Sequence, residues 1–239
     1  MKKHYVNPLI LILIVLIIGG CVLTNNLLNK NTLPVEITAP LLLNLNFDDL
    51  KDSSDYNNVL ENNGATLINS TIIFDGKSYI KVDKDFNNNQ NLSIAFWINP
   101  TKMQNGFVLA NGPTDNVPTL SIYFDSFKRL KFSRGKESVY TEPNTILFNT
   151  WSYVIITNNG ELTKFYVNGQ KIDEVQQFVK YNENQTETYI GKGYECSSIH
   201  LTFRCADLFF YGKLDDLKIY NKILEDTEIK QLYNENKKL

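Results

Sequence analysis

Hydrophobic and polar residues alternate along most of this chain, in short runs separated by residues that favour turns. In the run 91–100 every even-numbered position from 92 to 98 is aliphatic or aromatic, whereas the odd-numbered positions are Ser93, Ala95, Trp97 and Asn99. A period of two puts successive side chains on opposite faces of a strand, so this run predicts a strand with one core face. Similar runs predict strands at Leu41–Asp48, Thr71–Asp75, Ser78–Asp83, Phe107–Ala110, Leu120–Phe124, Leu130–Ser133, Trp151–Thr157, Leu162–Val167, Glu187–Ile190 and Leu214–Tyr220.

Turn residues and a terminal helix complete the predicted elements. Asn168-Gly169 separates two apolar runs and tolerates the positive φ angles of a two-residue hairpin turn, so we expect a hairpin there. Asp226 is placed to cap a short helix whose apolar stripe is Ile229, Leu232 and Tyr233, which we expect to pack against the edge of the sheets. Many strands without strand–helix alternation predict an all-β fold, an antiparallel two-sheet sandwich.

The N-terminus has a different pattern. Lys2 and Lys3 precede an unbroken aliphatic run, Leu9–Ile18, and Gly19-Gly20-Cys21 follows at once. This order is typical of an export signal, and the apolar stretch is also close to the length of an uncleaved transmembrane anchor. We therefore assign residues 1–21 to a signal peptide or membrane anchor and the polar, Asn-rich residues 22–40 to a flexible linker. Either interpretation places the domain on the extracytoplasmic face of a cell membrane.

Charge and cysteine content narrow the possible partners. The formal net charge of −2 and the absence of a basic stripe argue against nucleic acid as a partner. Besides Cys21, the chain has Cys196 and Cys205, which are close in sequence. In a non-reducing compartment such a pair favours a disulfide over a metal site, and only His200 lies near enough to add a zinc ligand.

The order of motifs from 41 to 233 resembles the concanavalin A-like lectin/glucanase superfamily in its laminin G-like (LamG) form, a jelly roll. Five segments carry this resemblance best: Leu45-Asn46-Phe47-Asp48, Ile73-Phe74-Asp75-Gly76, Leu92-Ser93-Ile94-Ala95-Phe96-Trp97-Ile98, Phe165-Tyr166-Val167-Asn168-Gly169 and Gly212-Lys213-Leu214-Asp215-Asp216-Leu217. Ile18-Gly19-Gly20-Cys21 similarly resembles a bacterial lipoprotein signal, which implies a lipid on Cys21. The resemblance implies that residues 41–239 form one LamG-like domain and that such a domain acts as a binding module, often for carbohydrate and sometimes for protein.

The resemblance also implies a metal site, because members of this family often hold a structural calcium ion. Asp215 shares its parity with Leu217 and Ile219, so we expect its carboxylate on the core side of its strand, where it needs a partner. Asp52 and Asp55 lie in an oxygen-rich loop, and hard oxygen ligands from several segments suit Ca²⁺. One hypothesis is therefore a Ca²⁺ held by Asp52, Asp55 and Asp215. The alternative is that the two loop aspartates form side-chain turns and Asp215 accepts backbone N–H bonds.

Motifs for catalysis are absent from the sequence. Jelly-roll glycosidases project two carboxylates from one strand, and no run of acids at alternate positions is present. There is also no Gly-x-Ser-x-Gly elbow and no zinc-binding His pair, so we expect no catalytic residues. Aromatic platforms for a ligand are available at Tyr123, Tyr140, Trp97 and Tyr153, although an aromatic side chain in an alternating strand is usually part of the core. The segments 103–118 and 193–211 depart most from the strand–turn pattern, and variable loops of a rigid scaffold are where binding tends to occur.

Taken together, the sequence predicts a surface-exposed, membrane-anchored, non-catalytic module, and the resemblance implies that it binds a glycan. Two alternatives remain open: an adhesion or scaffolding protein that binds a cell-surface protein, and a polysaccharide-degrading jelly-roll enzyme. The sugar is not specified by any residue pattern.

Overall fold

The computed structural model describes residues 37, 40–112, 119–135, 137–177, 186–199 and 202–237. Within these ranges, the side chains of residues 197–199 and 202–205 are not described. Residues Ile37–Leu239 make up one compact unit. The predicted signal or anchor and almost all of the predicted linker lie outside the described residues. In the described part of the chain, no helix has the length and apolar character needed to cross a bilayer.

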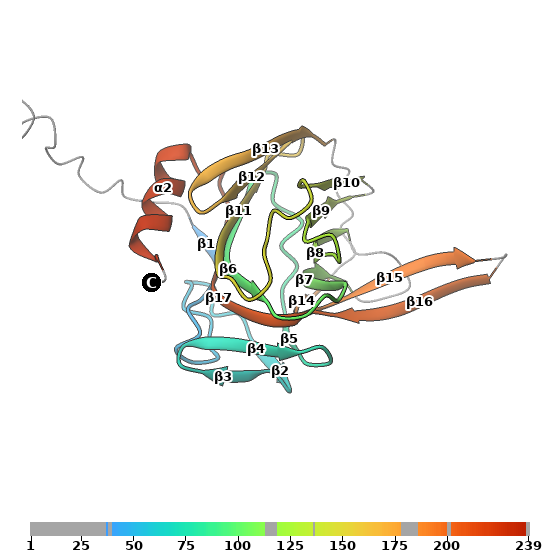
Figure 1. Cartoon of the computed structure of the whole chain (residues 1–239). Coiled ribbons are helices and arrows are strands. Elements are labelled where there is room, and N and C mark those ends of the chain that lie inside the picture. Colours follow the sequence, from blue (N-terminus) through green and yellow to red (C-terminus); the bar gives the residue numbers. More distant parts are fainter. Residues whose placement is uncertain are drawn as a thin grey trace, which may run out of the picture. The chain divides into compact units, whose positions relative to one another are not determined.

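Two sheets face each other and form a β-sandwich, as the alternating pattern predicts (Figure 1). The first sheet has eight strands in the spatial order β13-β12-β11-β6-β17-β4-β3, with β1 paired to β17. Its strands are β1 (Leu41–Leu45), β3 (Thr66–Ile68), β4 (Thr71–Asp75), β6 (Leu92–Pro100), β11 (Ser152–Asn158), β12 (Leu162–Val167), β13 (Gln170–Gln176) and β17 (Tyr211–Tyr220).

The second sheet has nine strands, and seven of them follow the order β10-β9-β8-β7-β14-β5-β2. Its strands are β2 (Leu60–Asn63), β5 (Tyr79–Val82), β7 (Gly106–Asn111), β8 (Leu120–Phe124), β9 (Leu130–Arg134), β10 (Glu137–Tyr140), β14 (Thr188–Ile190), β15 (Lys192–Ile199) and β16 (Thr202–Phe209). The named strands pair antiparallel, apart from a parallel contact between β16 and β7 at Phe209 and Phe107. The all-β, two-sheet fold predicted from the sequence is therefore confirmed.

The main core lies between the two sheets. The even-numbered residues of β6, from Leu92 to Ile98, belong to it, as their alternation predicts. Its other members include Phe74 of β4, Phe132 of β9 and Phe165 of β12. Burial of this many aromatic and aliphatic side chains is the main stabilising contribution to the fold.

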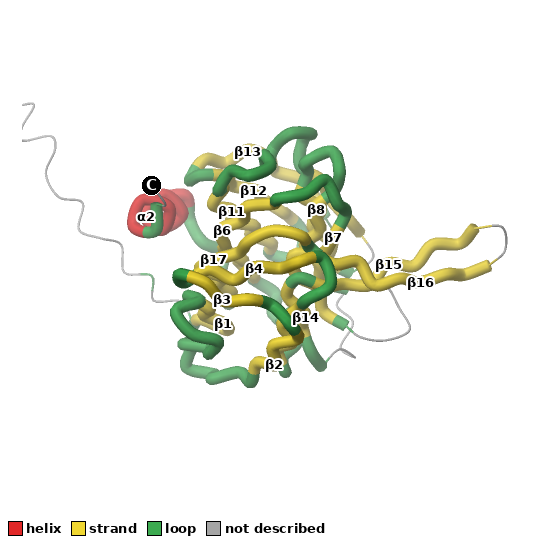
Figure 2. Tube along the Cα trace, turned by 60° about the horizontal axis from the view of Figure 1, so that its bottom comes forward, coloured by secondary structure: helices red, strands yellow, loops and turns green. Residues whose placement is uncertain are grey.

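A second apolar cluster covers the outer face of the first sheet. Ala95 and Trp97 of β6 pack there with Ile229 and Leu232 of the terminal helix α2 (Asp226–Glu235). All nine residues of β6 are therefore buried, although only alternate ones face the main core. Figure 2 shows α2 outside the sheet, where it covers part of the sheet face and does not pack at a sheet edge as predicted.

The helix begins one residue earlier than the sequence suggested. Glu225, not Asp226, is the N-cap, and it forms a capping box with Glu228: the Glu228 side chain accepts a hydrogen bond from the backbone N–H of Glu225 at 2.9 Å. Asp226 instead accepts a hydrogen bond from the hydroxyl of Tyr166, at 2.8 Å. This bond draws Asp226 toward the sheet and leaves the capping role to its neighbour.

The segment 193–211, expected to be a loop, forms strands for most of its length. β15 and β16 pair along their whole length and project from the second sheet as a two-stranded ribbon (Figure 2). Their sequence lacks a clear alternation of apolar and polar residues because a projecting ribbon has no core face to fill. The short strands β2, β3 and β10 were also missed, since each is three or four residues long.

Candidate functional site

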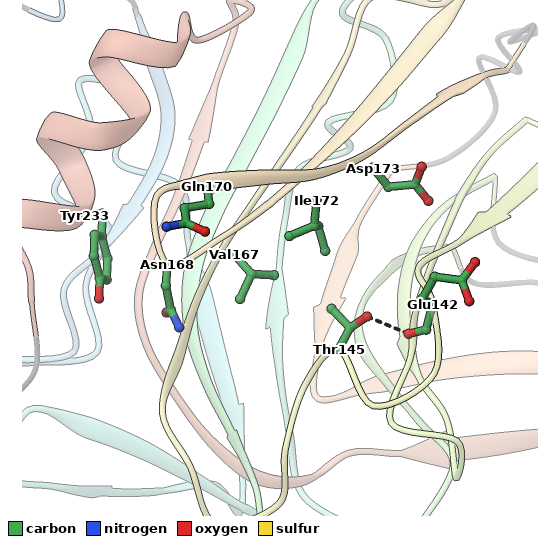
Figure 3. Close-up of a pocket in the computed structure, with 8 residues that line it drawn as sticks. All are labelled: Glu142, Thr145, Val167, Asn168, Gln170, Ile172, Asp173 and Tyr233. Carbon is green, nitrogen blue, oxygen red and sulfur yellow. Dashed lines mark hydrogen bonds between the residues drawn. The ribbon is translucent and has the colours of Figure 1, made fainter.

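A groove of about 560 Å³ lies beside the hairpin that joins β12 to β13. One wall comes from the hairpin, with Val167, Asn168, Gln170, Ile172 and Asp173. The segment that precedes β11 supplies Glu142 and Thr145, and α2 supplies Tyr233 (Figure 3). Three of the eight lining residues are apolar or aromatic and five are polar, so the groove can offer both an apolar surface and hydrogen-bonding groups to a ligand.

The tight turn of the hairpin shapes one end of the groove. Asn168 and Gly169 have φ angles of 51° and 76°, the positive values that the sequence predicted for this pair. The side-chain oxygen of Asn168 accepts a hydrogen bond from the backbone N–H of Tyr153 at 2.9 Å. This bond ties the turn to β11, so that the turn is held in place by the sheet.

Tyr233 is held in position by other aromatic rings. Its ring stacks on that of Tyr153 with centroids 6.3 Å apart and an interplanar angle of 24°. It also lies 6.1 Å from the ring of Trp97. Because Tyr153 and Trp97 are buried in the outer-face cluster, they form a fixed base under a half-buried ring that also borders the groove.

The polar side chains of the groove offer mainly acceptors. Glu142 and Asp173 border the groove on different segments (Figure 3), and among the described residues neither forms an ion pair. Thr145 donates its hydroxyl to the backbone oxygen of Glu142 at 2.5 Å, which holds this corner of the segment. Two carboxylates without cations favour ligands that donate hydrogen bonds, such as hydroxyl groups, and disfavour anions.

The groove combines residues that the sequence reasoning assigned to other roles. Asn168 was taken only as part of a turn, and Tyr233 only as part of the apolar stripe of the helix. Glu142 and Asp173 carried no motif. The contact between the hairpin and the helix brings these residues together, and no local pattern in the chain indicates that contact.

Asp52, one of the three predicted calcium ligands, organises the loop after β1. Its two carboxylate oxygens accept five hydrogen bonds at 2.7–2.9 Å, from the backbone N–H groups of Asn44, Ser54 and Asn58 and from the side chains of Ser54 and Asn58. Burial acts to raise the pKa of Asp52, but these hydrogen bonds outweigh it and hold the pKa below 3.8. The protein itself thus satisfies this carboxylate.

Asp215 is buried, but it does not face the core as its parity with Leu217 and Ile219 suggested. A β-bulge interrupts the pairing of β17 with β6 after Asp215, and Asp216 there has a φ angle of 47°. The extra residue reverses the parity, so Asp215 pairs with Trp97 on the outer face while Leu217 and Ile219 remain in the main core. The prediction that Asp215 faces the core is therefore wrong.

The partners of Asp215 and the exposure of Asp55 also bear on the calcium hypothesis. Asp215 accepts a hydrogen bond from the backbone N–H of Asp216 at 2.8 Å and one from the hydroxyl of Thr71 at 3.4 Å. Asp55 is exposed. In the described ranges, no group of three Asp, Glu, His or Cys side chains is placed to hold a metal ion. Asp52, Asp55 and Asp215 do not fit a shared Ca²⁺, and the geometry favours the alternative of turns and backbone acceptance.

Comparison with known proteins agrees with the sandwich fold. The family model described as the concanavalin A-like lectin/glucanases superfamily (Laminin_G_3) matches residues 74–230. The chain belongs to this superfamily. The resemblance inferred from the motifs is thereby confirmed, and the match includes the hairpin and the first half of α2.

Proteins that are similar to this chain include bacterial toxins. Botulinum neurotoxin type X from Clostridium botulinum is 28% identical over 176 residues, which cover 70% of this chain and 12% of the toxin. Among solved structures, the receptor-binding domain of botulinum neurotoxin C/D mosaic serotype matches with a TM-score of 0.64 and 16% identity, over 82% of this chain and 51% of that chain.

A structure of botulinum neurotoxin type C, which depends on interaction with two ganglioside molecules to enter cells, matches over the same shares. Its TM-score is 0.60 and its identity is 21%. At these identities the likeness shows the shared jelly-roll fold. The chain spans about half the length of these structures and about an eighth of the toxin relative.

Of the four aromatic residues considered as ligand platforms, three are buried in this protein. Trp97 and Tyr153 lie in the cluster beneath α2, and Tyr123 packs against Phe107 on the second sheet. Tyr140 is 43% exposed. Three of the four aromatic residues are thus packed within the fold, as their position in alternating strands indicated. Tyr140 stays a candidate platform for a ligand.

Cys196 and Cys205 stand opposite each other in the ribbon. Their backbones are direct partners in the antiparallel register of β15 and β16. Directly opposite residues have Cβ atoms about 4.5–5.5 Å apart. The predicted disulfide stays a prediction, and this register is compatible with it after a small adjustment.

Proposed function

We propose that this protein is a carbohydrate-binding module, held on the extracytoplasmic face of a membrane by its N-terminus, and that it catalyses no reaction. The observation that carries the proposal is the groove at the β12–β13 hairpin, which is lined by the ring of Tyr233, by the side-chain amide of Gln170 and by the carboxylates of Glu142 and Asp173. A sugar ring offers one face of C–H groups and a rim of hydroxyl donors. The groove offers a complement to both.

The ring of Tyr233 supports the stacking part of this proposal. It is half-buried and backed by Tyr153, so a sugar would stack on a platform whose position is already fixed. Val167 and Ile172 add apolar surface to the same groove. Pre-positioned aromatic surface lowers the entropy that binding costs.

The polar rim supports the choice of hydroxyl-rich ligands. Glu142, Asp173 and Gln170 border the groove with side-chain oxygens that accept from sugar hydroxyls. A glycosidase would use two such carboxyls, but its general acid needs burial that disfavours the charged form. Glu142 is exposed and Asp173 is only partly buried, which supports binding without catalysis.

The comparisons support a binding role. The similar solved structures are receptor-binding domains, and one belongs to a toxin that interacts with gangliosides. A fold alone does not give a function, so the weight of the proposal stays on the groove.

A glycan array probed with the purified protein tests the proposal. We expect binding to neutral oligosaccharides, competed by the free sugar, and a loss of about tenfold or more in affinity for Tyr233→Ala, as for truncation of an aromatic anchor. Tyr233→Phe should retain binding because it keeps the ring. Tyr56→Ala, which removes an aromatic side chain that is 52% exposed, is the matched control and should bind as the parent does.

Tyr233 also contacts the outer-face cluster, so its truncation can unfold the helix. Gln170→Ala and Glu142→Ala change exposed side chains of the groove and leave that cluster intact. Wild-type binding by these two variants, or an array without any bound glycan, would overturn the proposal. Release of reducing ends from a bound polysaccharide would show an enzyme instead.

The tether is tested at Cys21, which the resemblance to a lipoprotein signal marks for lipidation. Cys21→Ser should move the protein from the membrane fraction to the medium if the lipid holds it. Retention of the variant in the membrane would favour the uncleaved anchor, and recovery of the unmodified protein from the soluble fraction would contradict both forms of tether.

A role in adhesion to a cell-surface protein is the second candidate, favoured by the ribbon of β15 and β16. This ribbon projects from the second sheet (Figure 2). A projecting two-stranded ribbon offers strand edges to another chain. Capture of a surface protein that requires the ribbon, together with a blank glycan array, would favour this candidate.

A further inference from the structure

Five side chains on the outer face of the second sheet form an alternating row of rings and cations. The order is Phe127, Arg129, Tyr140, Lys131 and Tyr123, which we call the cation–aromatic ladder. The guanidinium carbon of Arg129 lies 5.0 Å from the ring centre of Phe127 and 4.8 Å from that of Tyr140. The ammonium nitrogen of Lys131 lies 5.8 Å from the ring centres of both Tyr140 and Tyr123.

The strand register explains why these residues meet. Tyr140 of β10 pairs with Lys131 of β9, and Lys131 pairs with Tyr123 of β8. Directly paired residues of antiparallel strands lie on the same face, so the three side chains form one row across the sheet. Phe127 and Arg129 extend this row from the turn between β8 and β9.

One end of the ladder is open to solvent. Phe127 is 63% exposed and Tyr140 is 43% exposed, whereas Tyr123 is buried against Phe107 and Leu208. Phe127 and Tyr140 therefore expose aromatic surface on either side of the Arg129 guanidinium, and a ligand can reach it.

Asp125 fixes Arg129 at this open end. The carboxylate of Asp125 accepts hydrogen bonds from Nε of Arg129 at 2.8 Å and from the backbone N–H groups of Phe127 and Arg129, and Nη2 of Arg129 lies 2.7 Å from it. The guanidinium is therefore positioned before any ligand arrives. Among the described residues, Nη1 of Arg129 has no acceptor.

Lys131 has no carboxylate partner within ion-pair distance in the described part of the chain. Two carboxylates lie beside other members of the ladder. Asp125 pairs with Arg129, and Glu195 lies near Tyr123. Burial, together with the charges of Glu195 and Asp125, raises the pKa of Tyr123. Lys131 is therefore the cation of the ladder that forms no ion pair among the described residues.

We propose that the open end of this ladder binds a carboxylated sugar, a second ligand class taken up by residues other than those that line the groove. The proposal rests on carbohydrate binding as the general function. The ring face of the sugar would stack on Tyr140 or Phe127, and its carboxylate would accept hydrogen bonds from Lys131 and from Nη1 of Arg129. Charge-assisted bonds to a carboxylate are the strong ones, and stacking on an aromatic ring adds to them.

The two sites differ in the sign of their charge. In the described part of the chain, Glu142 and Asp173 of the groove form no ion pair, which disfavours an anion beside them, and Lys131 of the ladder forms none either. The cation that does lie at the groove is Lys237, whose Nζ is 6.0 Å from the ring centre of Tyr233. We therefore expect a carboxylated sugar to bind at the ladder and a neutral sugar to bind in the groove.

Isothermal titration of the purified protein with trigalacturonic acid and with its methyl ester tests this directly. The ester keeps the ring and removes the charge. We expect the acid to bind about tenfold more tightly than the ester, the size of one charge-assisted hydrogen bond. Lys131→Gln and Arg129→Gln should each lower affinity for the acid by about the same factor and leave affinity for the ester unchanged.

Lys192→Gln is the matched control. Lys192 also lies over aromatic rings of the second sheet, 4.8 Å from the ring centre of Tyr79, but Asp207 pairs with it at 3.1 Å. This variant should bind the acid as the parent does. Tyr140→Phe keeps the platform and should bind, whereas Tyr140→Ala should not.

A carboxylated sugar can be a terminal sialic acid or part of a polyuronate. Titration with sialyllactose beside lactose tests the first source, and trigalacturonic acid beside its methyl ester tests the second. Preference for either acid over its neutral counterpart supports the ladder. Equal affinity for acid and neutral forms, an equal loss in the Lys192→Gln control, or no binding of either acid by a folded protein would overturn it.

Tyr233→Ala distinguishes this proposal from the groove. If the ladder is right, this variant loses neutral glycans and keeps the acid. If neutral glycans depend on Tyr233 and the acid shows no preference, the ladder fails and the groove stands.

Discussion

Gly169 lies against the ring of Tyr233. A Cβ atom at this glycine would come within 3.0 Å of Cδ1 of Tyr233 and within 3.3 Å of two further atoms of that side chain. The hairpin turn and the terminal helix are therefore fitted to each other, and this contact closes one end of the groove.

Gly169→Ala should destabilise the protein through both the backbone and the helix. Alanine at a φ of 76° costs about 1 kcal/mol, and crowding against Tyr233 should add about 1 kcal/mol more. Gly64→Ala is the control, because Gly64 has a φ of 85° but its added Cβ would meet only the Cβ of Ser78, at an ordinary 3.6 Å. Urea unfolding measures both, and equal losses would contradict the proposed contact.

Tyr153 and Tyr166 provide a matched pair on the same face of the first sheet. The hydroxyl of Tyr153 is buried and has no hydrogen-bond partner among the residues that the structure describes, whereas that of Tyr166 donates to Asp226 at 2.8 Å. Tyr166→Phe should therefore lower the free energy of unfolding by about 1–2 kcal/mol. Tyr153→Phe should leave it unchanged or raise it slightly, since it removes a buried group that has no partner. Thermal unfolding of the two variants side by side checks this, and a larger loss at Tyr153 would refute it.

The depressed pKa of Asp52 predicts how stability depends on pH. A carboxyl whose folded pKa lies below its unfolded value of 3.8 contributes stability above that value, and this is lost as pH falls through the folded pKa. The parent protein should therefore lose stability progressively below about pH 4. Asp52→Asn should be less stable at neutral pH and show a flatter profile in acid.

Asp55→Asn is the control for Asp52, because Asp55 is an exposed residue of the same loop. It should follow the parent curve at every pH. Identical acid profiles for Asp52→Asn and the parent would show that another carboxyl governs this transition.

Chelation should leave the melting temperature unchanged. The oxygens of Asp52 are occupied by protein donors, and Asp215 pairs with Trp97 on the outer face, so the three aspartates do not converge. Scanning calorimetry with and without EDTA checks this. A fall of several degrees, with calcium found in the purified protein, would restore the calcium hypothesis.

Thiol counting tests the predicted disulfide between Cys196 and Cys205. In denaturant without reductant, neither cysteine should react with a thiol reagent, and both should react after reduction. Reduction should also speed proteolysis of the ribbon while the sandwich keeps its melting temperature, because a two-stranded ribbon without a core is marginally stable. Reaction of both cysteines before reduction would show that they are not bonded.

The sequence determined most of the sandwich by itself. The strand β6 keeps its even-numbered residues in the core, and the Asn168-Gly169 turn has the positive φ angles expected of it. These features depend on a few neighbouring residues, whose side-chain alternation and backbone preferences are local properties of the chain. The candidate site was not accessible in this way, because its residues come from a loop, a hairpin and a helix that are distant from one another in sequence.

Only the tertiary structure decided the rest. The bulge at Asp215 and Asp216 reversed the parity read from the sequence, and the outer-face cluster buried Trp97 against α2. The groove and the cation–aromatic ladder arise where Tyr233 meets the hairpin and where Tyr140 pairs with Lys131. Such contacts join segments that are distant in sequence or depend on strand register, so they are fixed by packing and pairing rather than by the pattern of any one segment.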